Sequence, residues 1–433
     1  TTGSGLTAVG NQALDANTTG SNNTAVGSGA LGANTTGAGN TAIGWGALDA
    51  NTTGSNNVAV GKDCLGANTT GSENVAMAPN SALLSNTTGV GNVAIGNQAL
   101  MAATTANDNT AVGRYAGTAL TTGEDNVAIG SDALLVCTTG NRNVAIGYGA
   151  LKAATTGGGA TAHIAIGVAA LAAKTTDYGA GQNVSVGDHS LTSCTGGYRN
   201  TAVGGQHEGG QGALKNVTTG NYNCGFGLAS GYNITTASNN IAIGAFAMGN
   251  ATTGIDNICI GYGADTSASG STDQIVMGNS VTGNANDSFV IGNGSTDSAI
   301  AFGATSITAP SDVRLKEDIQ DEVVGLDFIN QLRPVTFRWK KEKDVPEDMV
   351  TYKADSEERV MNGKYNHGFI AQEVKEVIDN NPDIKEGFDM WSEDEADGRQ
   401  RIGDGALVPM LTKAIQELSA KVEVLEKQLN NKE

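Results

Sequence analysis

Residues 23–37 read NTAVGSGALGANTTG, and close variants of this stretch recur along residues 1–303. The pattern Asn-[Thr/Val]-Ala-[Val/Ile]-Gly, with substitutions in many copies, recurs eighteen times, most often at an interval of 17 residues. Its final positions are Gly10, Gly27, Gly44, Gly61, Ala78, Gly96, Gly113, Gly130, Gly147, Gly167, Gly187, Gly204, Gly227, Gly244, Gly261, Gly278, Gly292 and Gly303. Self-similarity at a fixed period predicts a stack of repeated structural units.

The length of the unit indicates what each repeat can form. Seventeen residues are too few for two helices and their turns, which need about 33 residues, but they suffice for one coil of short strands. Successive strand side chains face opposite ways, so Thr24 and Val26 are expected on one side and Ala25 on the other. We expect apolar side chains to fill the coil, with Ala30 and Leu31 forming its second wall.

Two recurring positions predict how the coils turn and stack. The Thr-Thr-Gly segment at residues 35–37 is expected to form a turn in which glycine tolerates a positive φ. The asparagine that opens each strand, such as Asn23, indicates either a column of stacked hydrogen bonds or a ligand site. His163, Gln274 and Ser288 replace it in three copies and can also form hydrogen bonds, which favours the column.

A coil of this size encloses few side chains, so a single stack would have a thin core. Oligomerisation is a natural remedy, because several stacks can bury surface against one another. We therefore expect several stacks, for example three, to pack through their small alanine and glycine faces.

The units that end at Gly167, Gly187 and Gly227 are longer than the others. Insertions in solenoids form loops on one face, which is often the binding face. The candidate receptor-contacting residues in and beside these loops are Tyr178, Tyr198, His207 and Tyr222. Tolerated surface loops without a binding role are the alternative interpretation.

The composition divides the chain into two parts. Of the 61 glycines in 433 residues, 54 lie in residues 1–310, which contain only 7 Lys and Arg; residues 311–433 contain 18 Lys and Arg. The net charge of -19 excludes an electrostatic nucleic-acid binder, and no run of 18 apolar residues predicts a membrane span. Because the five scattered cysteines fit no disulfide or metal-ligand spacing, we expect reduced thiols, no metal and no cofactor.

Over residues 1–303 the repeat resembles the head domains of trimeric autotransporter adhesins, which carry a similar Asn-x-Ala-[Ile/Val]-Gly-x-x-Ala pattern. It also resembles the repeat shafts of bacteriophage tail fibres. The resemblance implies a mainly β fold, with a trimeric left-handed parallel β-roll or β-solenoid as the shaft. Neither the handedness nor the number of chains follows from the spacing alone.

The part after Pro310 predicts a small α+β module. Residues 326–339 indicate a short helix that runs into a strand, residues 367–375 a strand that enters a helix, and the end a long helix. In this order the segments resemble the intramolecular chaperone of endosialidases, a self-cleaving domain at the ends of phage tail spikes and fibres. The resemblance covers residues 311–433 and implies that the domain trimerises, helps the shaft to fold and then cuts itself off.

The same resemblance implies a catalytic pair. Cleavage in that family falls just before the Ser of a Ser-Asp-x-x-x-Lys motif, and the matching residues here are Ser311 and Lys316. The scissile bond would therefore join Pro310 to Ser311. A desolvated lysine can activate a hydroxyl, because burial lowers the pKa of an amine. Asp312 and Arg314 are expected to support the pair, with Arg314 as a structural partner.

The terminal helix carries an apolar seam with alternating spacings of four and three residues. Its members are Leu411, Ile415, Leu418, Val422, Leu425 and Leu429. This heptad pattern predicts a parallel coiled coil over residues 407–430. The residue types at the two core positions would by themselves favour a dimer. The family resemblance implies a trimer, which is our expectation.

Together these features predict the distal part of a phage tail fibre, in a virion whose proteins are made in the host cytoplasm. The expected domains are a shaft at 1–305, a linker with the cleavage site at 306–310 and a chaperone at 311–433 that acts as a single-turnover serine autopeptidase. The expected partners are two identical chains, a host cell-surface glycan or protein receptor, and upstream tail-fibre or baseplate proteins. The shaft is expected to be non-enzymatic. A polysaccharide-depolymerising tail spike and a bacterial trimeric adhesin are the alternatives.

Overall fold

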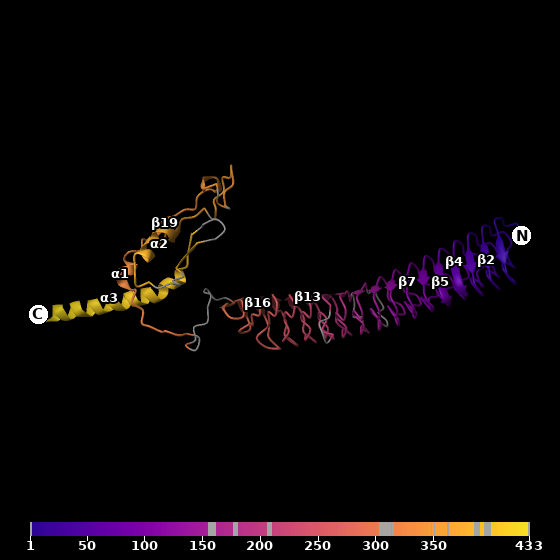
Figure 1. Ribbon diagram of the computed structural model, residues 1–433, viewed down its shortest axis with the longest axis horizontal. Coiled ribbons are helices and arrows are strands. Elements are labelled where there is room, and N and C mark those ends of the chain that lie inside the picture. Colours follow the sequence, from indigo (N-terminus) through magenta and orange to yellow (C-terminus); the bar gives the residue numbers. More distant parts are fainter. Residues whose placement is uncertain are drawn as a thin grey trace. The chain divides into compact units, whose positions relative to one another are not determined.

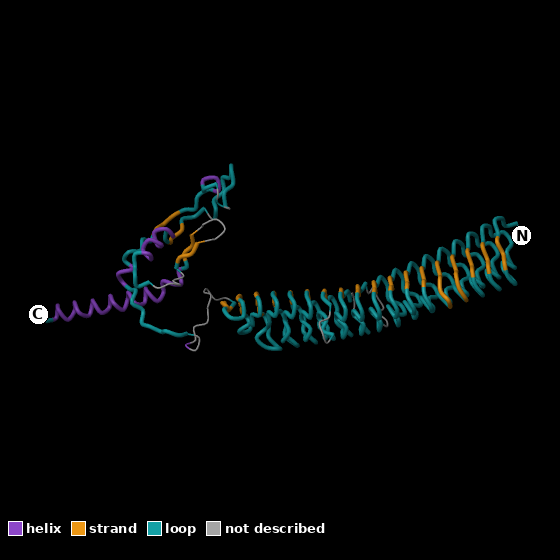
Figure 2. Tube along the Cα trace, viewed as in Figure 1, coloured by secondary structure: helices purple, strands orange, loops and turns teal. Residues whose placement is uncertain are grey.

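The computed structural model describes residues 2–154, 162–175, 181–205, 210–302, 313, 316–347, 349, 351–361, 363–384, 390–393 and 400–431, apart from the side chain of Asp404. The chain divides into two compact units, Thr1–Pro310 and Ser311–Glu433. Figure 1 shows the elements of each unit in the order of the sequence, and Figure 2 shows that strands occur along the first unit and that most helical residues belong to the second.

The first unit is a parallel β-solenoid in which each coil contributes one short strand. Neighbouring strands pair in register, so that Thr24 lies beside Thr41 and Val26 beside Ile43. The parallel strands among the described residues are β1 (Thr7–Val9), β2 (Thr24–Val26), β3 (Thr41–Ile43), β4 (Val58–Lys62), β5 (Val75–Asn80), β6 (Val93–Ile95), β7 (Thr110–Val112), β8 (Val127–Ile129), β9 (Val144–Ile146), β10 (Ile164–Ile166), β11 (Val184–Val186), β12 (Thr201–Val203), β13 (Cys224–Phe226), β14 (Ile241–Ile243), β15 (Ile258–Ile260), β16 (Gln274–Gly278) and β17 (Ser288–Gly292). The predicted mainly β solenoid is confirmed.

The stack ends differently from the prediction. The last copy of the motif was expected to add an eighteenth coil, but β18 (Asp297–Ala301) runs antiparallel to β17. Only eleven residues separate Gly292 from Gly303, too few for the 17-residue unit. The chain therefore turns straight back along β17.

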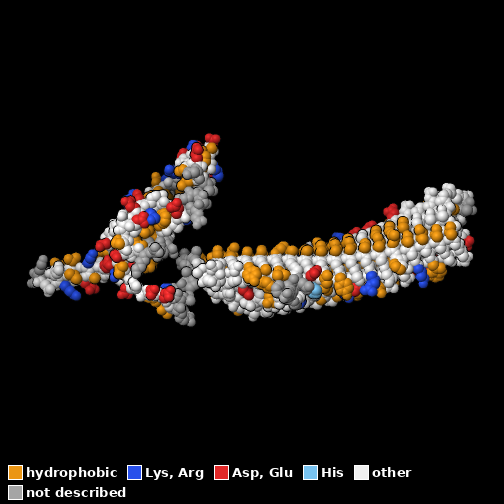
Figure 3. Space-filling view, viewed as in Figure 1, with side chains coloured by type: hydrophobic (Ala, Val, Ile, Leu, Met, Phe, Trp, Pro, Cys, Tyr) orange, Lys and Arg blue, Asp and Glu red, His pale blue; other side chains and the backbone are white. Residues whose placement is uncertain are grey.

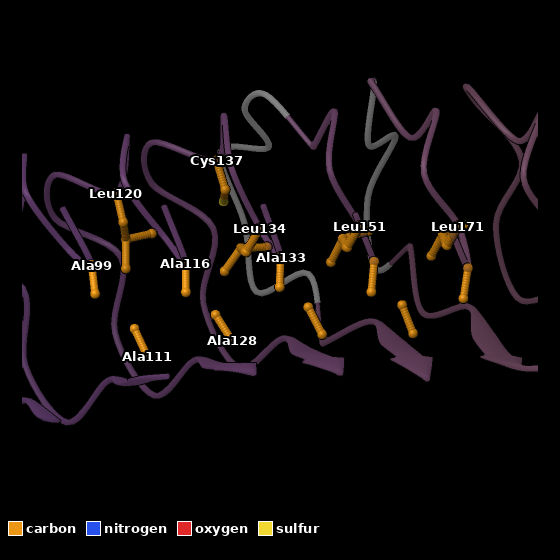
Figure 4. Packing of buried hydrophobic residues seen from close by; sticks show 14 of the residues in the cluster. Ala99, Ala111, Ala116, Leu120, Ala128, Ala133, Leu134, Cys137, Leu151 and Leu171 are labelled. Atoms are coloured by element: carbon orange, nitrogen blue, oxygen red, sulfur yellow. The ribbon is translucent and has the colours of Figure 1, made fainter. Parts of the chain in front are cut away.

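Small side chains fill the interior of each coil. Ala25, Ala30 and Leu31 are fully buried, which confirms the predicted second wall. Figure 4 shows the same arrangement further along the stack, with Ala111 and Ala128 next to the strands and Leu134 between the walls. The expectation that alanine faces lie outside, free to contact other stacks, is wrong. The alanine of each strand faces inward, where the leucine of the opposite wall leaves room for one methyl group.

The positive φ angles also fall elsewhere than predicted. Gly37 of the Thr-Thr-Gly turn does not have one, whereas Gly27 after the strand has φ 137° and Leu31 has φ 52°. A β-carbon on Gly37 would lie 2.3 Å from the carbonyl oxygen of Gly54. Close approach of the next coil, and not a left-handed backbone, therefore favours a small residue in this turn, where Ala106, Ala237 and Ser271 replace the glycine in three coils.

A leucine with left-handed backbone recurs in most coils, at Leu14, Leu31, Leu48, Leu65, Leu83, Leu100, Leu134, Leu151, Leu171, Leu191 and Leu214. This backbone costs an ordinary residue about 1–2 kcal/mol. Complete burial of a leucine side chain contributes about 1.5–3 kcal/mol and offsets that cost. The strain persists because it places the largest apolar side chain of the unit inside the coil.

The asparagines that precede the strands form the predicted hydrogen-bonded column. The side-chain oxygen of Asn109 accepts bonds from the backbone and side-chain nitrogens of Asn126, both at 3.0 Å. Its side-chain nitrogen donates to the carbonyl of Gly123 at 2.9 Å. At the position of His163 the ring continues the column, with Nδ1 accepting from the backbone of Asn183 at 3.2 Å. The column satisfies buried backbone groups that would otherwise lack partners.

The second unit is a small α+β arrangement that ends in a long helix. Its elements are α1 (Leu326–Ile329), β19 (Val335–Phe337), η2 (Glu342–Asp344), β20 (Asn366–Gly368), α2 (Ala371–Asp379), β21 (Trp391–Glu393), β22 (Gln400–Ile402), η3 (Asp404–Ala406) and α3 (Leu407–Asn430). The strands pair antiparallel, β19 with β20 and β21 with β22. Phe328, Val374, Met390, Leu407 and Met410 form its buried core. None of the helices in the described part of the chain has the length and hydropathy required to cross a membrane.

Candidate functional site

Most of the predicted cleavage site lies outside the described residues: Pro310, Ser311, Asp312 and Arg314. Lys316 is described, and its backbone nitrogen donates to the carbonyl of Val313 at 3.2 Å. Its side chain is exposed. A lysine that acts as a base is usually desolvated, and Lys316 is not buried in the described part of a single chain.

The segment that follows the cleavage site is joined to the terminal helix. The backbone nitrogen of Leu326, the first residue of α1, donates to Oε2 of Glu417 in α3 at 3.0 Å. A β-carbon on the preceding Gly325 would lie 2.8 Å from the same carboxylate. Glycine at this position therefore allows the carboxylate to bind the start of α1.

A second contact links the segment between α1 and β19 to α2. Nε of Arg333 donates to Oε2 of Glu373 at 2.8 Å, and a second guanidinium nitrogen donates to Oε1. Hydrogen bonding by Arg333 lowers the pKa of Glu373 below its ordinary value. Two parallel bonds of this kind fix orientation as well as distance, so the pair orients the segment after α1 against α2.

The apolar seam of α3 is uncovered in the single chain. Leu411, Ile415, Leu418, Val422, Leu425 and Leu429 are all exposed, from 42% at Leu411 to 66% at Ile415 and Leu429. Leu407, Met410 and Ala414 are buried instead, where α3 packs on its own unit. The seam residues thus form an apolar row that the described residues of one chain do not cover.

Two of the four candidate receptor residues lie together on neighbouring coils. The rings of Tyr198 and Tyr222 meet edge to face, with centroids 5.5 Å apart. Arg199 donates to the hydroxyl of Tyr222 at 2.7 Å and lies 5.4 Å from the centre of its ring. Tyr178 and His207 fall outside the described residues.

The sequence analysis missed Arg199 in this cluster. The spacing contains the signal for it, because the interval between Gly204 and Gly227 is 23 residues and so is that between Arg199 and Tyr222. Residues separated by one full unit occupy the same place in successive coils. The register alone therefore brings this arginine beside the tyrosine.

Among the described carboxyl groups of the shaft, Asp265 has a perturbed pKa. Burial raises the pKa of Asp265 above its ordinary value, against the opposing effect of two backbone donors. Its oxygens accept bonds from the backbone of Asn250 at 3.0 Å and of Thr266 at 2.9 Å. These bonds give Asp265 a structural role in holding two turns.

The fold defines the chain as a β-solenoid that is followed by a small α+β region ending in a long helix. A peptidase family model, described as "Chaperone of endosialidase", matches residues 311–381. The chain therefore carries an endosialidase chaperone domain after its solenoid. A domain of this family implies a self-cleaving chaperone and a trimeric assembly. Searches of curated proteins and of solved structures found no match to this chain.

The match is shorter than the resemblance predicted from the sequence. It covers 311–381, whereas the resemblance extended over 311–433. It begins at Ser311 and ends just after α2, so β21, β22 and α3 lie beyond it.

Proposed function

We propose that this chain is the distal part of a virion tail fibre, in which three copies form a shaft that binds the surface of a bacterial host. The C-terminal domain holds the three chains together, sets their register and then cuts itself off before Ser311. The observation that carries the proposal is the order of the two parts, a long solenoid followed directly by an endosialidase chaperone domain. Without a folding nucleus, three chains with many similar coils would align slowly, because contacts between residues far apart in sequence must form first.

The proposed cleavage uses Ser311 and Lys316. The neutral amine of Lys316 takes the hydroxyl proton of Ser311, and the oxygen attacks the carbonyl carbon of Pro310. The bond between that carbon and the nitrogen of Ser311 breaks, and the nitrogen receives the proton. Water then hydrolyses the resulting ester, leaving a carboxylate on Pro310 and a free amine on Ser311.

The exposure of Lys316 adds a condition to this mechanism. In one chain its side chain is exposed to water, whereas a lysine that serves as a base is desolvated. Contacts with the other two chains would remove that water. Cleavage would then follow assembly, so that the chaperone is released only after it has brought the chains together.

The seam of α3 provides a test of the trimer. Replacing Ile415 and Val422 by aspartate would place charges in the predicted helical interface, and we expect a monomer that remains uncut. The matched control is Val424→Asp, because Val424 is 54% exposed on the same helix but outside the seam. Native mass spectrometry and a denaturing gel give both readouts. If the seam variant remains trimeric, the seam of α3 is not needed to hold the three chains together, and this part of the proposal is wrong.

The cluster of Tyr198, Arg199 and Tyr222 is the proposed receptor contact on the described surface. Aromatic and arginine side chains dominate binding energy at interfaces, so we expect Tyr222→Ala to weaken binding to host cells roughly tenfold. The control is Tyr262→Ala, because Tyr262 is 56% exposed on a different coil. Binding of labelled trimers to cells of the host measures both variants. Equal binding by the Tyr222 variant and the parent would exclude this cluster as the contact.

A further inference from the structure

The outer side of the strands forms a continuous apolar surface. It consists of the first and third residues of each strand triplet, such as Val127 and Ile129 in β8, which flank an inward-facing alanine. We call this surface the outer strand face. Because the strands pair in register, the corresponding residues of the longer β16 and β17 are Ile275, Met277, Phe289 and Ile291. From β1 to β17 these positions contain only Val, Ile, Thr, Met, Phe and one cysteine, Cys224. The shaft has 23 charged residues in 1–310, and none occupies these positions; Lys62, the last residue of β4, lies two residues beyond them.

The outer strand face is accessible in the single chain. Val9 is 58% exposed, Ile166 36% and Ile291 47%, at the start, middle and end of the stack. Figure 3 shows rows of hydrophobic side chains that run along the solenoid. Seventeen strands at a spacing of about 4.8 Å give a length of about 77 Å. With a width of about 10 Å the surface approaches 800 Å², which is larger than ordinary exposed apolar patches and equals one partner's share of a standard interface.

We infer that the outer strand face is the surface through which the three shafts pack, each coil against the same coil of the other two chains. The inference rests on the proposed trimer and identifies the part of the shaft that forms it. Identical chains held in parallel by the terminal helix bring equal residue numbers to the same level. Around a threefold axis each side chain therefore approaches its own copies.

This geometry explains why the face lacks charge. A lysine or glutamate there would meet two like charges in a site from which water is excluded, which is strongly unfavourable. Valine, isoleucine and threonine can contact their own copies without such a cost. The interface replaces the alanine and glycine contact that the sequence suggested, and it gives each thin coil a second apolar layer.

Cysteine cross-linking in the full chain tests the inference. In a Cys224→Ser background, Ile129→Cys places a thiol on the outer strand face. Val136→Cys is the matched control, because Val136 belongs to the next turn of the same coil and both residues are 37% exposed. After mild oxidation we expect Ile129→Cys to give covalent dimers on a non-reducing gel and Val136→Cys to remain as single chains. We also expect a bulky maleimide to label Val136→Cys but not Ile129→Cys.

The mass of the native assembly separates the possible failures. If the protein is a trimer but Ile129→Cys neither cross-links nor resists the maleimide, the face is free for another partner and the inference is wrong while the trimer stands. Cross-linking of Val136→Cys alone would assign the interface to another side of the coil. If the native protein is a monomer, the proposed trimeric function fails as well.

Discussion

The Ser311→Ala variant is expected to remain a single chain, whereas the parent separates into fragments 1–310 and 311–433. The substitution removes the hydroxyl that attacks the Pro310 carbonyl, so no ester can form. A denaturing gel combined with intact mass measurement distinguishes the uncut chain from the two fragments. A variant that is cut at the rate of the parent would show that another nucleophile acts.

The role of Lys316 can be separated from its charge. Lys316→Arg keeps the positive charge but removes a base, because a guanidinium does not lose its proton in proteins. We expect cleavage to slow by roughly 100-fold or more, as for the loss of a general base. Lys340→Arg serves as the control outside the motif and should cut normally. If the parent remains uncut, the domain acts as a retained trimerisation module and the catalytic pair is withdrawn.

A large loss of stability is expected from Gly113→Ala in the shaft. Gly113 has φ 139°, and a β-carbon there would lie 2.6 Å from the carbonyl carbon and oxygen of Gly130 in the next coil. At the equivalent Ala78 the strand pairing shifts register and the unit that follows has one extra residue. Gly113 lies between 17-residue units without that adjustment, so we expect a destabilisation of about 3–5 kcal/mol. Thermal unfolding of the full chain, followed by circular dichroism, measures the change.

Gly149→Ala is the matched control for this prediction. Gly149 also has a positive φ, 64°, but its β-carbon would meet only the end of the Lys152 side chain, at 3.8 Å. The expected cost is therefore the left-handed backbone alone, about 1–2 kcal/mol. Equal losses of stability in the two variants would mean that the positive φ of Gly113, and not its contact with Gly130 in the next coil, causes the destabilisation.

The repeat made the solenoid predictable, because the 17-residue period limits each unit to one coil and Asn109 and its equivalents have partners one period away. The direction of the strand side chains was predictable as an alternation, but not which side faced inward. That choice depends on the width of the coil, which the left-handed Leu31 helps to set. The left-handed region is unfavourable for leucine, so the sequence does not predict this backbone and only the packing in the structure explains it.

The candidate sites were less accessible to sequence reasoning. The motif around Ser311 and Lys316 could be recognised, but no pattern in the sequence indicates that Lys316 is exposed in one chain. Arg199 was missed because its contact with Tyr222 crosses a lengthened unit and requires a count of residues between coils. The charge and type of a residue do not show which residue of the next coil lies beside it.

Because the coils pair in register, the length of the shaft can change in evolution by whole coils. Each coil bonds only to the coils before and after it, so duplication or loss of one 17-residue unit rejoins matching surfaces. Every such event would change the distance between the two ends by about 4.8 Å and leave the remaining coils as they were. Fibre length can therefore vary in small inherited steps, independently of the residues that recognise the host.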